Sequence, residues 1–207
     1  MSEALEDLGT ALFNGTLPGV WRSLAPATEK PLGAWMAHFA ARHAQYTGWI
    51  ASGEPLVMWL SGLHIPESYL TALVQVTCRR KGWALDRSTL YTTVTRFVTP
   101  EDVPARLSDG CYVRGLYLEG AGWDRARNCL VRQDPKTLVV ELPILQVVPI
   151  EAARLQLAGT FRTPVYVTQA RRNAMGVGLV VEADLFSNEH PSHWVLQGVA
   201  LTLNTSD

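Results

Sequence analysis

The sequence has little of what a secreted, membrane-bound or nucleic-acid-binding protein needs. Only 18% of its 207 residues are charged and the net charge is −1, so no bulk field attracts nucleic acid or an anionic membrane. No apolar run approaches the ~20 residues of a membrane span. The acidic N-terminus also lacks the apolar core of a signal peptide. We expect a soluble intracellular protein that binds neither nucleic acid nor membrane.

Cysteine is scarce as well. Cys78, Cys111 and Cys129 are an odd set of three with no closely spaced pair, which does not match the disulfide framework of a small secreted domain. We expect three buried, reduced and unlinked thiols.

Sequence motifs of catalysis are missing. There is no phosphate-binding loop with its lysine, and the glycine pair Gly176 and Gly178 opens a strand pattern, not a helix. Ser61 lacks the first glycine of a nucleophile elbow. Glu119 and Asp124 flank a glycine turn, and turn capping explains them more simply than paired acid–base catalysis. A hydrolase that uses Ser61 or a histidine is the least favoured hypothesis.

The histidines do not form a metal-binding pattern. His38 and His43 are five residues apart, so they do not share a helix face. His190 and His193 flank a turn, but no third ligand lies near them in the sequence. We expect no catalytic residue, no cofactor and no metal.

Tryptophan, in contrast, is abundant, with seven residues in 207. Tryptophan is enriched both in cores and at protein interfaces. Two interpretations stay open, a tryptophan-rich core or a domain that docks a broad surface on a partner.

The first third of the chain has helical periodicity. Residues 2–13 carry Leu5, Leu8 and Leu12 on one face, which predicts a short helix. Residues 16–30 form a proline-rich connector in which we expect Trp21 to be an anchor against the core.

Two longer helices follow. The first spans residues 31–52, with Pro31 in the first helical position, an amphipathic stripe and Gly53 after its end. The second spans 66–81 and stops at Gly82. Its last turn holds three cations, which suit a solvated helix end better than a binding patch.

From residue 90 onward the period changes to that of strands. Short strands separated by turn signals indicate an antiparallel barrel or sandwich. Strands are predicted at 56–60, 90–98, 112–118, 129–133, 137–141, 144–149, 164–169, 179–183 and 194–203. The expected fold class is α+β, with a helical subregion at 1–88 and an antiparallel β subregion at 89–207 that together form one compact unit.

The stretch 111–124 looks like the one around which the chain is organised. Its first half alternates like a strand. Gly120 and Gly122 then supply a tight turn or bulge, so that the stretch forms a hairpin or a corner, with a positive φ at one of them at least. Trp123 should point at the core or at the helical half, and the alternative is an exposed docking residue. Arg114, between apolar neighbours, either forms a salt bridge in the sheet or faces a partner.

Motifs along nearly the whole chain resemble the C-terminal domain of dynein heavy chains. The strongest is YVRGLYLEGAGWD at 112–124. The others, in order, are LPGVW at 17–21, KPLGAW at 30–35, WLSG at 59–62 with PESYLT at 66–71, ELP at 141–143, TPVY at 163–166, and HW at 193–194 with GVAL at 198–201. The chain departs from the family at Thr163, where cysteine is usual, and at 171–178, a shorter loop without the usual Ser/Thr run.

The resemblance implies a helical subregion followed by a small antiparallel β-barrel, packed on one face of an AAA+ ring. Such a module is non-catalytic and modulates the force and processivity of a microtubule motor in the ciliary axoneme. Its partners would be the AAA+ ring modules of the same heavy chain, and microtubules only through the rest of the motor. We expect further chain, with Walker motifs, before Met1.

The alternative is an independent β-barrel protein that binds a ligand or peptide between its two halves. For either function we single out a set of structural or interface candidates. These are Trp21, Trp35, Trp59, Arg114, Gly120, Gly122, Trp123, Asp124 and Trp194.

Overall fold

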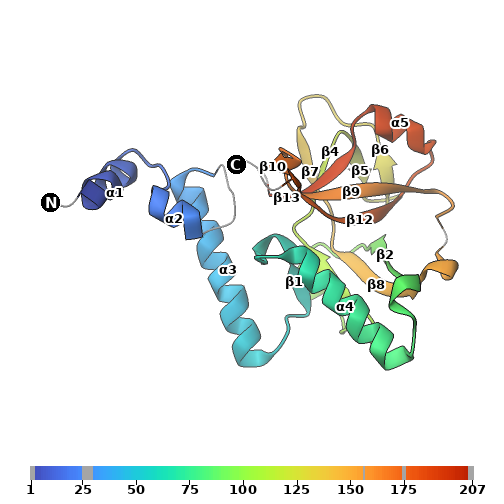
Figure 1. The fold of residues 1–207 in the computed structure, drawn as a ribbon. Coiled ribbons are helices and arrows are strands. Elements are labelled where there is room, and N and C mark those ends of the chain that lie inside the picture. Colours follow the sequence, from blue (N-terminus) through green and yellow to red (C-terminus); the bar gives the residue numbers. More distant parts are fainter. Residues whose placement is uncertain (1–2, 25–29, 156, 174–175, 205–207) are drawn as a thin grey trace. The chain divides into compact units, whose positions relative to one another are not determined.

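The computed structural model describes residues 3–24, 30–155, 157–173 and 176–204 (Figure 1). It divides into two compact units, residues 1–54 with 205–207, and residues 55–204. Five α-helices lie among the described residues: α1 (Glu3–Phe13), α2 (Gly19–Leu24), α3 (Leu32–Ser52), α4 (Pro66–Lys81) and α5 (Pro191–Leu196). Short 3₁₀ turns occur at Leu60–Gly62, Leu85–Arg87, Pro100–Asp102 and Ala152–Arg154. None of the described helices is both long and apolar enough to cross a membrane.

The strands of the second unit form several sheets. They are β1 (Val57–Trp59), β2 (Ser88–Val94), β3 (Cys111–Arg114), β4 (Tyr117–Glu119), β5 (Gly122–Asp124), β6 (Cys129–Val131), β7 (Val139–Glu141), β8 (Leu145–Glu151), β9 (Thr160–Thr168), β10 (Arg172–Asn173), β11 (Gly176–Val177), β12 (Leu179–Phe186) and β13 (Ala200–Asn204). Their sheets have the orders β1-β3-β8-β2, β12-β9-β13-β4-β7, β5-β6 and β10-β11.

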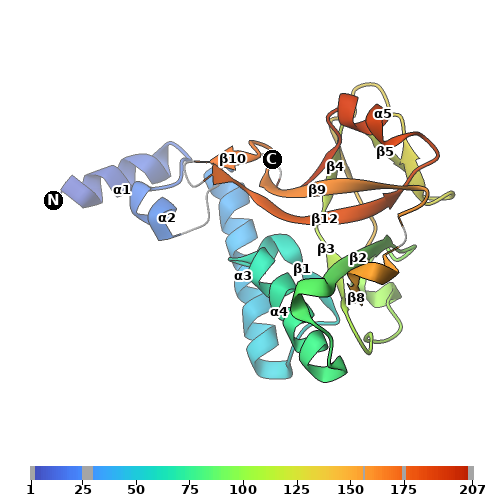
Figure 2. The ribbon, with the colours of Figure 1, turned by 45° about the vertical axis from the view of Figure 1, so that its right-hand side comes forward.

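Most neighbouring strands are antiparallel, and Figures 1 and 2 show the long pair β9 and β12 running side by side. The pairs β1–β3 and β9–β13 are parallel. The α+β class is therefore confirmed. No closed barrel is found among the described strands, so the barrel stays a prediction.

The first unit is helical. The predicted helix at 2–13 is α1, except for Ser2, which lies outside the described residues. The connector at 16–30 was predicted without a helix, and this was wrong, because residues 19–24 form α2. The segment between Pro18 and Pro26 is free of proline, and the Arg22 N–H donates to the Pro18 carbonyl at 3.0 Å to start the turn. Pro26 itself lies outside the described residues.

Helix α3 is the longest helix of the described residues, with 21 residues. Its predicted ends are nearly right, since Pro31 precedes the first helical residue and Gly53 follows the last with φ of 86°. Within the described residues the helix buries only Trp35. Of its apolar stripe, Phe39 and Ile50 are exposed, whereas Leu32, Tyr46 and Trp49 are half-buried.

The stretch 111–124 contributes a strand to each of three sheets. β3 pairs with β1 and β8, β4 pairs with β13 and β7, and β5 pairs with β6. Because β4 and β5 belong to different sheets, the glycine turn between them is a corner and not a hairpin. This stretch is central to the second unit, as the alternation and glycines predicted.

Glycines make the two corners in this stretch possible. Gly115 has φ of 81°, and a Cβ there would lie 2.6 Å from the Trp59 ring. Gly120 has φ of 75°, which confirms the expected positive φ, and its Cβ would lie 2.8 Å from the Gln197 carbonyl oxygen. Gly122 has no positive φ, but its Cβ would lie 3.0 Å from the Arg132 carbonyl oxygen. A side chain would clash most at Gly115 and Gly120, where the contact falls below 3.0 Å, and would be tightly packed at Gly122.

Helix α4 belongs with the strands. It was expected in a helical subregion that runs to residue 88, but the units divide after Glu54, because α4 packs against β2, β8 and β12. It buries Leu70, Thr77 and Cys78, and Gly82 ends it with φ of 69°. Its cationic last turn is tied down, since Arg80 and Lys81 both pair with Asp109.

The strand predicted at 194–203 was wrong in its first half. Residues 191–196 form α5, which starts at Pro191 and is capped where the His190 Nδ1 accepts from the Ser192 N–H at 3.3 Å. Gly198, with φ of 67°, follows the helix, and β13 begins at Ala200. The core of the second unit lies between these elements and the sheets. Its largest fully buried side chains include Trp194, Met58, Leu60, Leu116, Leu118, Ile144, Leu145, Leu185, Leu201 and Leu203.

Candidate functional site

An aromatic groove lies on α2 and α3 in the first unit. It has a volume of about 550 Å³ and is lined by Trp21, Trp35, Met36, Phe39, Arg42, His43 and Tyr46. On α3, Trp35, Phe39, His43 and Tyr46 lie three or four residues apart, and Met36 and Arg42 lie beside them, which places all six on one broad helix face. The rings form a continuous stack, with centroids 5.9 Å apart for Trp21 and Trp35, and 5.2 Å apart for Trp35 and Phe39. Two of the tryptophan candidates therefore meet here.

The outer part of the aromatic groove is exposed. Trp35 is 9% exposed, whereas Met36 is 47% and Phe39 is 50% exposed. Large apolar side chains gathered in one exposed hollow mark interaction sites more often than single exposed residues do. Arg42 and His43 add basic groups to an otherwise apolar lining. The groove is therefore a candidate interaction surface of the first unit.

Trp59 and Arg114 come together in the second unit. The Arg114 guanidinium lies 5.7 Å from the centroid of the Trp59 ring, within the range of a cation–π contact. Arg114 is exposed on the central strand β3, and β1 with Trp59 is its parallel neighbour. The contact explains how a cation is accommodated between apolar strand residues.

Trp123 and Asp124 follow the second corner of the 111–124 stretch. Trp123 is 8% exposed, so its predicted burial is confirmed. The Asp124 Oδ1 accepts from the backbone N–H of Ala126 at 2.9 Å and of Arg127 at 3.0 Å, so it caps the turn between β5 and β6 and not the glycine turn for which capping was predicted. The Glu119 carboxylate lies 3.4 Å from Arg171.

Trp194 is the most deeply buried tryptophan of this set, at 1% exposed. Its Nε1–H donates to the Ser187 Oγ at 2.6 Å, and the His193 ring packs edge-on against it with centroids 4.7 Å apart. These contacts give Trp194 and both histidines of this turn structural roles. Among the described residues, no group of His, Cys, Asp or Glu is arranged to hold a metal ion.

The three cysteines are buried and free of disulfides, as the sequence predicted. Burial raises the pKa of the Cys129 thiol, and the Asp124 carboxylate adds to the effect. A raised pKa keeps the thiol protonated and unreactive.

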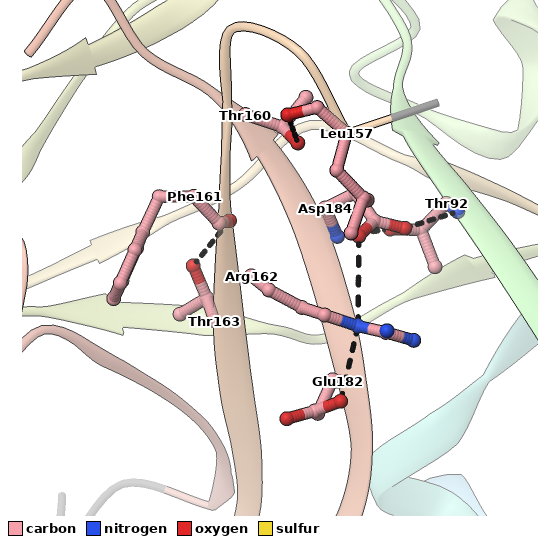
Figure 3. Close-up of polar contacts among 8 residues, drawn as sticks. All are labelled: Thr92, Leu157, Thr160, Phe161, Arg162, Thr163, Glu182 and Asp184. Atoms are coloured by element: carbon pink, nitrogen blue, oxygen red, sulfur yellow. Dashed lines mark hydrogen bonds and ion pairs between the residues drawn. The ribbon is translucent and has the colours of Figure 1, made fainter. Parts of the chain in front are cut away.

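Sequence reasoning missed a buried polar pair that joins two sheets. The Thr92 N–H donates to the Asp184 Oδ2 at 3.2 Å, and the Asp184 N–H donates to the Thr92 Oγ1 at 2.5 Å (Figure 3). Thr92 lies on β2 and Asp184 on β12, each at the edge of its sheet. The available signal was an acid inside the apolar strand pattern at 179–186.

The charge of Asp184 is poorly compensated. Its nearest cation, the Arg162 Nε, lies 3.8 Å from Oδ1 and 3.0 Å from the Glu182 Oε2 (Figure 3). Burial raises the pKa of Asp184, although the Thr92 hydrogen bonds and Arg162 act against the rise. Desolvation is the larger effect.

Asp184→Asn is expected to stabilise the fold most at neutral pH. Because burial raises the folded-state pKa of Asp184, protonation of its carboxyl group stabilises the fold. This stabilisation is complete below the unfolded-state pKa and is lost as the pH rises through the folded-state pKa. Asparagine stays neutral at every pH, so the variant should avoid a cost of about 1.4 kcal/mol for each unit by which the pKa of Asp184 is raised. Thermal melts at pH 7.5 and pH 5 should show a stability gap between variant and parent that narrows with acid. Glu182→Gln controls for charge lost near Arg162, and a gap that widens with acid would contradict the assignment.

A family profile for the C-terminal domain of the dynein heavy chain matches residues 1–203. The sequence is 62% identical over 205 residues to "Dynein axonemal heavy chain 10" of Homo sapiens. It is 66% identical over 203 residues to "Dynein-1-alpha heavy chain, flagellar inner arm I1 complex" of Chlamydomonas reinhardtii. Identity is 39% over 205 residues to the "Dynein beta chain, flagellar outer arm" of the same alga.

The protein belongs to the family of C-terminal domains of dynein heavy chains. These matches cover 98–99% of its sequence but only 4–5% of the length of each relative. The relatives are axonemal or flagellar heavy chains by name, which confirms the resemblance to the axonemal type.

Proposed function

We propose that the protein is the non-catalytic C-terminal module of an axonemal dynein heavy chain, packing on the AAA+ motor ring of that heavy chain. The packing modulates the force and processivity of an ATP-driven microtubule motor in the ciliary or flagellar axoneme. The module contacts microtubules only through the rest of the motor. The family match and the two identities above 60% support this assignment.

The aromatic groove is the observation that carries the proposal. A half-exposed phenylalanine and methionine beside stacked tryptophans are the kind of anchors that dominate protein interfaces. Burying them against a partner recovers about 25 cal/mol for each Å² of apolar surface. In this proposal Trp21 and Trp35 belong to the interface.

The remaining candidates have structural roles in the proposal. They hold the corners, stacks and caps of the second unit, and they are Trp59, Arg114, Gly120, Gly122, Trp123, Asp124 and Trp194. We further propose that the β sheets of this unit form a small antiparallel barrel. The Thr92–Asp184 pair supports it, because it bridges the edge strands of the two largest sheets.

Phe39→Ser in the complete heavy chain is expected to loosen the module from the ring. Truncating a central aromatic anchor costs about 2 kcal/mol or more of interface stability. Faster limited proteolysis between ring and module, with reduced stall force, is the expected result. Ile50→Ser is the matched control, since Ile50 lies on the same helix, is 88% exposed and does not line the groove. Equal behaviour of the two variants would count against the groove as the interface.

An ATPase assay and a nucleotide titration on the isolated domain separate this function from other classes. The proposal expects neither turnover nor tight ATP binding, and either result would refute it. The alternative, an independent ligand- or peptide-binding β-barrel, expects stable function without the rest of a heavy chain.

A further inference from the structure

A second groove lies within the second unit, between helix α4 and the edge strand β12, and we call it the helix–strand groove. It has a volume of about 350 Å³, inside the ~300–1,000 Å³ range of ligand pockets. One wall is a face of α4, with Glu67, Leu70, Thr71 and Val74 at positions i, i+3, i+4 and i+7. The opposite wall is the start of β12, residues 179–182. The groove therefore has a helix on one side and a strand on the other.

The strand wall of this groove is a sheet edge. β12 is the last strand of its sheet, and β9 is its one neighbour in the described sheets. The Asp184 N–H donates to the Thr92 Oγ1 on β2, so it points away from β9. Because main-chain groups alternate in direction along a strand, the N–H and C=O of Glu182 also point away from β9. The register agrees, since Glu182 lies opposite Pro164, which has no N–H to donate.

The side chains of the groove are mostly apolar, and acidic groups stand at its rim. Leu70 is buried and Leu179 is 48% exposed. The carboxylate of Glu182 is neutralised, because its Oε2 lies 3.0 Å from the Arg162 Nε (Figure 3). Glu67 is exposed, and no ion pair in the described part of the chain includes it. An uncompensated carboxylate therefore lies beside an apolar groove.

An extended polypeptide matches these features together. Its main chain presents N–H and C=O groups at the spacing of a strand edge, and every second side chain reaches the same face. A lysine or arginine beside the apolar side chains would pair with Glu67, whereas an anion would be repelled. We propose that the helix–strand groove binds an extended segment of another protein, which adds a strand to β12, places aliphatic side chains against Leu70 and Leu179, and pairs a cation with Glu67. Neither the family match nor the proposed ring contact, which uses the first unit, assigns a role to this groove.

Amide resonances of the ¹⁵N-labelled 207-residue chain test the strand addition. The probe is the peptide acetyl-Lys-Val-Thr-Val-Thr-Lys-amide, which alternates apolar and polar side chains and has a cation near each end. Saturable binding should slow hydrogen exchange of the Glu182 N–H, whereas the Val181 N–H, which faces β9, should keep its rate. Equal rates at Glu182 with and without the peptide would overturn the proposal.

Two N-methylated peptides decide whether the main chain is recognised. One is methylated at both valines and the other at both threonines. In an extended strand these two sets of N–H groups face opposite sides, so only one set can donate to β12. One methylated peptide should therefore bind like the parent and the other should not bind. Equal binding of the two would contradict strand addition.

Variants of α4 locate the binding site. Thr71→Trp fills the groove from an exposed position and should weaken peptide binding about tenfold or more. Ala72→Trp is the matched control, because Ala72 is exposed on the same helix and does not line the groove. Glu67→Gln should weaken binding about threefold at low salt, but not when norleucine replaces both lysines of the peptide. Equal effects of the two tryptophan variants, or unchanged binding in Glu67→Gln, would overturn the assignment.

Titration of the complete heavy chain with a fluorescent form of the same peptide tests the source of the segment. An affinity within about threefold of that of the 207-residue chain is expected, because a groove reserved for another protein stays open. Loss of binding that Thr71→Trp does not deepen would show that the heavy chain covers the groove with its own residues, and would overturn the proposal. Phe39→Ser should leave peptide binding unchanged, so failure of this inference is distinguishable from failure of the proposed ring contact.

Discussion

Replacing Trp194 with alanine is expected to lower the free energy of unfolding by about 3–5 kcal/mol. The indole is 1% exposed, and its removal leaves a large cavity under α5 where the surrounding helix and sheet can relax only partly. The change also removes the Nε1–H donor of the 2.6 Å bond to Ser187. No other single side chain of the described core combines this volume with a buried hydrogen bond of its own.

Chemical denaturation of the isolated domain measures the loss. Trp194→Phe keeps most of the ring and removes the hydrogen bond, so its expected cost is smaller, about 1–3 kcal/mol. Val195→Ala is the neighbouring control, because Val195 is exposed on the same helix. A midpoint for Trp194→Ala equal to that of the control would show that α5 does not seal the core.

Gly120→Val is expected to cost at least about 2–3 kcal/mol. A left-handed φ of 75° is itself unfavourable for a β-branched residue, by about 1–3 kcal/mol. In addition, the new Cβ would lie 2.8 Å from the Gln197 carbonyl oxygen, a backbone atom that cannot rotate away. The corner from β4 to β5 would have to open, and with it the pairing of β4 with β13.

Two other glycines separate the strain from the clash. Gly82 has φ of 69° with no atom within 4 Å of a Cβ, so Gly82→Val reports the backbone strain alone. Gly122 lacks the positive φ but has the Arg132 carbonyl at 3.0 Å, so Gly122→Val reports close packing. Thermal melts should rank Gly120→Val as the most destabilising of the three. If it proved no worse than Gly82→Val, the corner would not be the tight junction described above.

The sequence predicted those elements whose ends carry their own signals. A proline at the start of the first helical turn and a glycine after the last turn predicted the ends of α3 and α4 to within a residue or two. The alternation predicted one strand at 112–118, but Gly115 divides it into β3 and β4 of two different sheets. The glycine pair predicted a hairpin or a corner after it, and the structure has the corner. Each of these signals is local, so no knowledge of distant contacts was needed.

The errors came from short helices and distant contacts. Helices α2 and α5 have six residues each, which is too short for a periodic pattern of apolar residues. The prolines around α2 therefore led to the prediction of a connector, and the resemblance to a family strand motif led to the prediction of a strand at α5. The Thr92–Asp184 pair joins residues 92 positions apart, and only the fold brings them together. The aromatic stripe of α3 was predicted, but its exposure depends on which elements cover it.

The most direct test of the proposed ring contact is the accessibility of position 39 in two settings. Phe39→Cys should react quickly with a maleimide in the isolated domain, where the side chain is half exposed. In the complete heavy chain, peptide mass spectrometry should show labelling slowed about tenfold or more, since packing on the ring covers the aromatic groove. Ile50→Cys measures the general accessibility of α3 in both settings. Labelling of Phe39→Cys at the same rate in the isolated domain and in the heavy chain would contradict the proposal that this groove packs on the ring.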